Sequence, residues 1–188
     1  MADLALFRKI LTIAEELRQQ GSWTGETHLQ KVGYFLQELL GVPLNAEYIL
    51  YKHGPYSFGL HNTLEEMRAF QYVDWRPNPY PYGPTLVEGP LGETLKRFTD
   101  EPSELRNRIT FAAQSLGKKR VTELERLATA LYVTLNGDRS ADRSTRIHEL
   151  KPHVEIADAQ AAVAELDEII TAAKKLGLVQ QSSLGAAS

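Results

Sequence analysis

Cysteine is absent from this chain of 188 residues. Disulfide bonds, catalytic thiolates and cysteine-ligated zinc are therefore excluded, and the lack of cysteine is typical of a cytoplasmic protein. The sequence also lacks any run of about 18 apolar residues, and its first residues include an early acid and no small-residue cleavage site. We expect a cytoplasmic protein with neither a membrane span nor a signal peptide, long enough to bury a substantial core without cross-links.

Positive charge is also scarce. Lys and Arg total 21 against 24 Asp and Glu, which gives a net charge of −3, and neither half of the chain is basic. A protein that binds nucleic acid regardless of sequence needs a surplus of Lys and Arg facing the phosphates. The composition therefore disfavours DNA as a partner, while a local basic patch remains open.

Patterns of familiar catalytic and metal sites are missing as well. The sequence has no P-loop, no G-x-S-x-G elbow and no G-x-G-x-x-G after a strand, which disfavours NTPases, nucleophilic hydrolases and dinucleotide-binding enzymes. None of the histidines has the helical spacing to another histidine or a patterned carboxylate that a metal site needs. The histidines are His28, His53, His61, His148 and His153. We predict no metal, no cofactor and no catalytic residue, so an enzyme is the less favoured interpretation.

What the sequence does contain is a compact structural signal at residues 48–57. The run Y-I-L-Y is suited to a strand, and Gly54-Pro55 then interrupts whatever precedes it. Ser57 is suited to cap a following helix. We expect the rest of the fold to be organised around this strand, turn and helix start.

The first half of the chain has the element order of a winged helix-turn-helix. Apolar periodicity predicts helices over 4–20, 24–40 and 57–70, with Thr24 as the cap of the second and Phe70 on the inward face of the third. Extended segments are predicted at 47–51, 72–76 and 85–88. The last two flank residues 77–84, whose four prolines and one glycine favour a projecting loop. We predict a winged-helix-like region at 1–90 with a small β-hairpin wing.

The second half is predicted to be almost entirely helical. Helices are expected at 91–99, 103–116, 120–135, 141–150 and 158–176, with Ser103 capping the second of these. The fold class is therefore mainly α, with a C-terminal helical bundle over 91–179 packed on the winged-helix-like region. Residues 180–188 are small and polar, and we expect a flexible tail there.

Two linked motifs carry a family resemblance. The predicted second helix reads T-H-L-Q-K-V-G-Y-F-L-Q over 27–37, and Y-K-H-G-P-Y-S follows at 51–57. This pair resembles the YwgA-like proteins and the broader Panacea group of antitoxin-associated domains, over roughly residues 4–90. The resemblance implies a small winged-helix domain of bacteria or phage, encoded near toxin or defence genes, that acts by binding a protein. It implies no characterised reaction, and the long helical C-terminal half departs from the Panacea pattern.

Two interpretations of the K-H-G-P-Y-S turn stay open. In the first, Gly54 lets the backbone approach a ligand, the next helix offers free N–H groups, and Lys52 and His53 add positive charge, which together suit an anion or a nucleotide. In the second, Gly54 supplies an unusual φ and both tyrosines of the motif belong to the core. We favour the second. Gln30 and Lys31 could complete a polar pocket there, but on a buried helix such residues more often bond to neighbouring backbone.

The preferred functional hypothesis is a non-enzymatic interaction module, antitoxin-like or defence-associated, that binds a protein partner or forms a homodimer. The first alternative is a winged-helix transcriptional regulator, which the acids on the third helix disfavour because they repel phosphate. The second is an uncharacterised enzyme or a nucleotide- or anion-binding protein that uses the turn. Candidate partner- or ligand-binding residues are Lys31, Tyr51, Lys52, His53, Gly54, Tyr56, Ser57, Arg76, Tyr80 and Tyr82.

Overall fold

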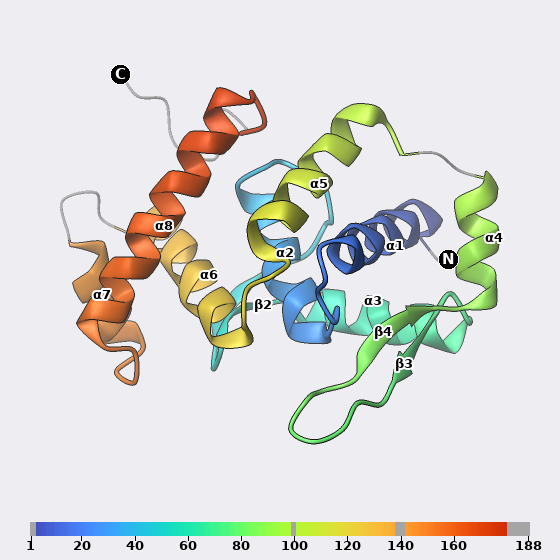
Figure 1. Ribbon diagram of the computed structural model, residues 1–188, viewed down its shortest axis with the longest axis horizontal. Helices are drawn as coiled ribbons and strands as arrows, with labels where there is room; N and C mark the ends of the chain where they lie inside the picture. The colour runs from blue at the N-terminus through green and yellow to red at the C-terminus, as the bar shows by residue number, and fades with distance from the viewer. Residues whose placement is uncertain (1–2, 99–100, 138–141, 180–188) are drawn as a thin grey trace.

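The computed structural model describes residues 3–98, 101–137 and 142–179, so the predicted tail at 180–188 lies outside the described residues. Within those ranges the chain is mainly α-helical, as predicted, and has two small antiparallel β-hairpins, one of which was predicted (Figure 1). The elements are α1 (Leu4–Gln19), α2 (Glu26–Glu38), β1 (Ile49–Tyr51), β2 (Gly54–Tyr56), α3 (Phe58–Ala69), β3 (Val73–Arg76), β4 (Thr85–Glu88), α4 (Pro90–Phe98), α5 (Ser103–Leu116), α6 (Val121–Asn136), α7 (Arg143–Leu150) and α8 (Ile156–Lys175). Each helix lies within two residues of its predicted bounds.

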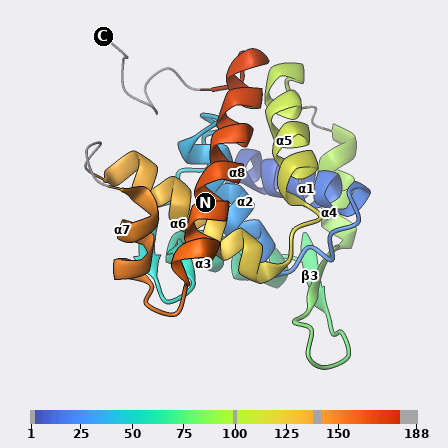
Figure 2. The same cartoon turned by 60° about the vertical axis from the view of Figure 1, so that its left-hand side comes forward.

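Helix α2 forms the centre of the molecule. Every side chain from His28 to Leu36 is buried, whereas an ordinary surface helix buries one stripe. Helices α5 and α6 pack on α2, and α5 also packs on α1, so the C-terminal helices cover the N-terminal ones directly. In Figures 1 and 2, α6, α7 and α8 stand together beside this central layer. One hydrophobic core therefore runs through both halves of the chain.

The β3–β4 hairpin is the predicted wing. Its strands pair antiparallel, with Val73 opposite Glu88 and Arg76 opposite Thr85, and the buried side chains of Val73 and Leu86 anchor it to the core. Residues 77–84 form a loop that projects away from the helices in both views (Figures 1 and 2). Tyr80, near its tip, is 97 % exposed. The proline-rich sequence thus gives the projecting loop expected of it.

A second hairpin, β1–β2, was not predicted. The sequence indicated a strand before the Gly-Pro pair and a helix after it, but Gly54, Pro55 and Tyr56 form a strand of their own, paired with Ile49–Tyr51. Lys52 and His53 make the tight turn between the two strands. Both strands of a two-stranded sheet are edge strands, where a proline without an N–H group is tolerated.

Three local predictions are wrong for identifiable reasons. Thr24 does not cap α2, because its backbone turns to φ 53° and Gly25 takes the cap position. Ser103 is the first helical residue of α5, after the cap residue Pro102. Phe70 is 52 % exposed, because it lies beyond the last turn of α3. The cap predicted at Ser57 is confirmed, since its Oγ accepts a hydrogen bond from the Leu60 N–H at 3.1 Å.

Candidate functional site

Three polar side chains of α2 hold the segment that contains the β1–β2 hairpin. Gln37 exchanges two hydrogen bonds with the backbone of Ala46, at 2.8 and 2.9 Å, and Gln30 does the same with Ser57, both at 2.9 Å. Between them, Lys31 Nζ donates to the Pro55 carbonyl at 2.8 Å. The bonds to neighbouring backbone expected of Gln30 and Lys31 are therefore present, and the helix motif and the turn motif bond to each other.

The C-terminal half holds the same hairpin from the other side. Lys151 Nζ donates to the carbonyls of Tyr51 and of Lys52, the latter at 2.9 Å. Gly54 lies so close to α6 that a Cβ atom there would be 3.0 Å from Thr129 Oγ1 and 3.2 Å from the Glu125 carbonyl. Its φ of +85° also belongs to the region that favours glycine. The close approach predicted for Gly54 is thus an approach to a helix.

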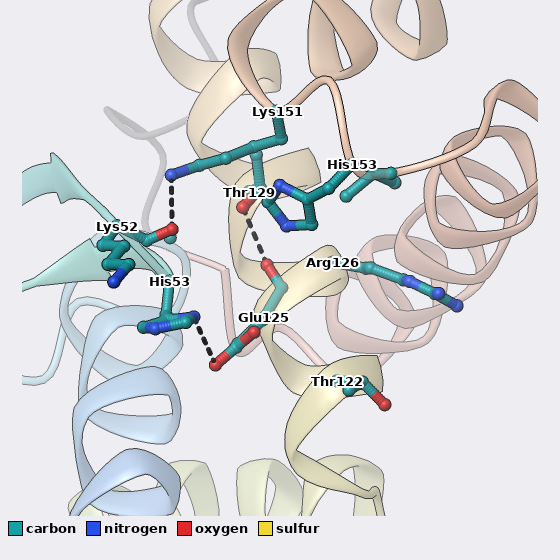
Figure 3. Close-up of a pocket in the computed structure, with 10 residues that line it drawn as sticks. Lys52, His53, Thr122, Glu125, Arg126, Thr129, Lys151 and His153 are labelled. Carbon is teal, nitrogen blue, oxygen red and sulfur yellow. Dashed lines mark hydrogen bonds and ion pairs between the residues drawn. The ribbon is translucent and has the colours of Figure 1, made fainter.

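Two pockets lie beside this hairpin, and His53, Gly54 and Glu125 line both of them. The larger, about 300 Å³, is lined by Glu26, Thr27, Gln30, Lys31, Tyr51, His53, Gly54, Tyr56, Phe58 and Glu125. The smaller, about 70 Å³, is lined by Lys52, His53, Gly54, Thr122, Glu125, Arg126, Thr129, Lys151, His153 and Val154 (Figure 3). Gln30, Lys31, His53 and Tyr56, which were considered for a polar pocket, all line the larger pocket.

An aromatic cluster, Tyr51, Tyr56 and Phe58, forms one wall of the larger pocket. Ring centroids lie 5.1 Å apart for Tyr56 and Phe58 and 5.6 Å apart for Tyr51 and Phe58, both in edge-to-face geometry. The expectation that both tyrosines are core residues is wrong, because Tyr51 and Phe58 are each 51 % exposed and Tyr56 is half-buried. The cluster is a surface feature formed by the β1–β2 hairpin and the first residue of α3.

Glutamate side chains lie near the tyrosine, histidine and lysine side chains beside the β1–β2 hairpin. Tyr56 donates to Glu26 at 2.9 Å, and desolvation together with this bond raises the pKa of Tyr56 to about 12. His53 Nδ1 lies 3.5 Å from Glu125 Oε1. Burial lowers the pKa of Lys31 to about 8, although the nearby Glu125 carboxylate opposes the shift. Burial also lowers the pKa of Lys151.

The arrangement gives little support to an anion site in the smaller pocket. Figure 3 shows Lys151 reaching the Lys52 carbonyl, while Arg126 binds Asp158 at 2.8 Å. The Lys52 side chain is exposed to solvent. The N-terminus of α3 is occupied by the hydroxyl of its own cap residue, Ser57. Across the described ranges no three His, Asp or Glu side chains are grouped so that they could hold a metal ion.

The wing residues stand apart from this site. Arg76 is exposed at the end of β3, and Tyr80 lies at the loop tip. Tyr82 packs edge-to-face on Trp23, with centroids 5.1 Å apart. None of the three lines either pocket beside the β1–β2 hairpin.

Sequence reasoning missed Glu26, Phe58, Glu125 and Lys151 as parts of the site. Glu125 and Lys151 belong to the C-terminal half, and Lys151 reaches a carbonyl 100 positions earlier in the chain. No local motif marks such a contact. Phe58 directly follows the cap residue of α3, and its place in the Y-x₄-Y-S-F run was the one available signal.

The buried amine of Lys31 predicts a pH effect on stability. Its pKa is about 8 in the folded chain against an ordinary 10.5, so between these values the unfolded chain binds more protons and stability rises with pH. Relative to Lys31→Met, which does not titrate, the wild-type free energy of unfolding should rise by about 2 kcal/mol from pH 7 to 9.5. Urea unfolding at both pH values measures this difference. An unchanged difference would show that Lys31 titrates normally.

Comparison of the chain with protein-family models, with curated proteins and with solved structures finds no match. Among the helices of the described ranges, none combines the length and the apolar character needed to cross a membrane. The candidate site therefore rests on the geometry described above.

Proposed function

We propose that this protein is an interaction module that binds a protein partner through the aromatic cluster beside the β1–β2 hairpin. The observation that carries the proposal is the exposure of Tyr51 and Phe58 on a segment whose backbone accepts hydrogen bonds from Gln30, Lys31 and Lys151. Aromatic residues are enriched at the energetic centres of protein interfaces. A surface that is already ordered loses less conformational entropy on binding.

The proposal also concerns the class of protein that this chain binds. The motifs on α2 and in the turn resemble YwgA-like and Panacea sequences, which supports a toxin or a defence protein as the partner. A second copy of this chain is the other candidate. The exposed loop tyrosine Tyr80 would add a contact at the wing.

The charges on α3 support a protein over DNA as the partner. Glu65 and Glu66 are exposed on this helix, where a winged-helix protein would face phosphate. Arg68, the one basic residue among the helical residues Phe58–Ala69, already lies 3.7 Å from Glu65 and 3.5 Å from Asp74. A DNA-binding role remains the alternative hypothesis.

A photo-crosslinking amino acid placed at Phe58 tests the proposed surface. We expect a covalent adduct with one partner protein in the native host, because Phe58 lies at the exposed edge of the aromatic cluster. The matched control is the same amino acid at Leu176, which is 64 % exposed after α8. Mass spectrometry of the adducts identifies the partner.

The double variant Tyr51→Ala/Phe58→Ala should weaken binding of that partner at least tenfold, since aromatic anchors each contribute about 1 kcal/mol or more. Binding is measured with purified components. Crosslinking of equal yield at Phe58 and Leu176, or an unchanged affinity in the double variant, would refute the proposed surface. An adduct with a second copy would identify the partner as the chain itself.

A further inference from the structure

The amine of Lys31 has more hydrogen-bond donors than the described part of the fold uses. Its side chain is 2 % exposed, yet within the described part of the chain its ammonium group makes one hydrogen bond, to the Pro55 carbonyl. A protonated lysine has three N–H donors. Lys31 also lines the larger pocket. The structure thus places a buried lysine, whose amine makes one hydrogen bond within the described ranges, in the lining of a pocket of about 300 Å³.

Lys151 offers a comparison within the same protein. Its ammonium group donates to two carbonyls of the β1–β2 turn, those of Tyr51 and Lys52, and it lines the smaller pocket. Lys151 therefore acts as a structural clamp. Among the described residues Lys31 makes one such bond, and it lines the larger pocket, which distinguishes its geometry from that of Lys151.

The groups around Lys31 suit an amine that reacts as a nucleophile. Glu26 on α2 and Glu125 on α6 line the same pocket, and both attract the protonated amine, while burial and the positive charge of Lys151 act against protonation. The net result is a pKa of about 8, so a sizeable fraction of the amine is neutral near pH 7.5. His53, at the turn, also lines this space. A desolvated neutral lysine is the usual form of a Schiff-base nucleophile.

We propose that Lys31 forms a Schiff base with a small, neutral aromatic aldehyde bound in the larger pocket. The neutral amine adds to the carbonyl carbon, and the carbonyl oxygen takes up a proton to give a carbinolamine. Loss of that hydroxyl as water, with loss of the remaining N–H proton, leaves the C=N bond. In this proposal Glu26 and Glu125, which line the same pocket, carry these protons. The step consumes amine and aldehyde, releases one water and needs no other reactant.

The walls of the pocket define the class of aldehyde. The aromatic cluster provides ring faces and edges for an aromatic ligand. The carboxylates of Glu26 and Glu125 line the same pocket as Lys31, and their negative charge disfavours an anionic carbonyl compound such as a keto acid. The volume lies at the small end of the range for ligand sites. The inference goes beyond the proposed function, and its test needs no protein partner.

Reductive trapping with benzaldehyde tests the inference on the full-length protein. The protein is incubated with benzaldehyde at pH 7.5, the C=N bond is reduced with borohydride, and peptide mass spectrometry locates each benzyl group. Lys31 should be modified at least about tenfold faster than the exposed Lys52, because part of the buried Lys31 amine is neutral and the pocket that Lys31 lines holds the aldehyde beside it. The rate should rise with pH through about 8. Because every lysine is read in the wild-type protein, the measurement does not depend on a variant that folds.

Variants and a second aldehyde complete the test. Lys31→Met should abolish the fast modification, whereas Lys174→Arg, at an exposed position of α8 away from the site, should leave it intact. Glyoxylate, an anionic aldehyde, should modify Lys31 at least about tenfold more slowly than benzaldehyde does. Modification of Lys52 or Lys151 ahead of Lys31 would overturn the assignment of the amine. Equal rates for the two aldehydes would overturn the assignment of a neutral aromatic ligand.

Discussion

Replacing Gln30 with alanine is expected to lower the free energy of unfolding by about 2 to 5 kcal/mol. The Gln30 amide satisfies both the N–H and the carbonyl of Ser57, and the side chains of both residues are fully buried. Each buried polar group left without a partner costs about 1 to 3 kcal/mol. The same bonds fix the start of α3, so the aromatic cluster should lose its order as well.

Gln37 provides a matched control on the same helix. It makes the same pair of bonds to Ala46, but its side chain is half-buried, so water can replace part of the loss. Gln37→Ala should therefore cost about 1 kcal/mol. Urea unfolding of both variants measures the two values. Equal losses would show that burial of the Ser57 backbone is not what makes Gln30 important.

Substitution of Gly54 by alanine should destabilise the protein by about 3 kcal/mol. Part of the loss comes from a side chain at φ +85°, which costs about 1 kcal/mol or more. The rest comes from contact with α6, because a Cβ atom 3.0 Å from Thr129 Oγ1 and 3.2 Å from the Glu125 carbonyl would force these neighbours to shift by a few tenths of an ångström. The variant should also disturb both pockets, since Gly54 lines each of them.

Gly21 separates these two contributions. Its φ is +82°, close to that of Gly54, but no atom lies within 4 Å of the position that a Cβ would take. Gly21→Ala should therefore cost about 1 kcal/mol, the backbone contribution alone. Thermal or urea unfolding of the two variants gives the difference. Equal costs would mean that α6 can move away from the hairpin without loss.

Sequence periodicity predicted the helices well because each carries its own apolar pattern. The wing was predictable for a similar reason, since residues 77–84 combine four prolines with flanking strand-like segments. The β1–β2 hairpin was not, because Gly54-Pro55 indicates a break and Pro55 is unusual in a strand. Its pairing depends on contacts with α2 and α6 that the local sequence does not encode.

The candidate site was predictable in its N-terminal part only. Gln30, Lys31 and the turn residues stood out because polar residues on an apolar helix and a Gly-Pro pair are locally unusual. Glu125 lies on α6 and Lys151 follows α7, and each is an ordinary charged residue in its own segment. Exposure of Tyr51 was mispredicted, because an aromatic residue in a short strand is suited equally to a core and to a surface.

The hydrogen bonds from Lys151 to the carbonyls of Tyr51 and Lys52 make the hairpin depend on an intact C-terminal half. A fragment that ended after the wing would retain every residue of the two linked motifs, yet it would lose α6 and Lys151, which brace the turn. The motifs are thus necessary for the aromatic surface but insufficient to present it. A protease cut between α4 and α7 that released the C-terminal helices would therefore remove the support of the aromatic cluster without cleaving the segment that contains it.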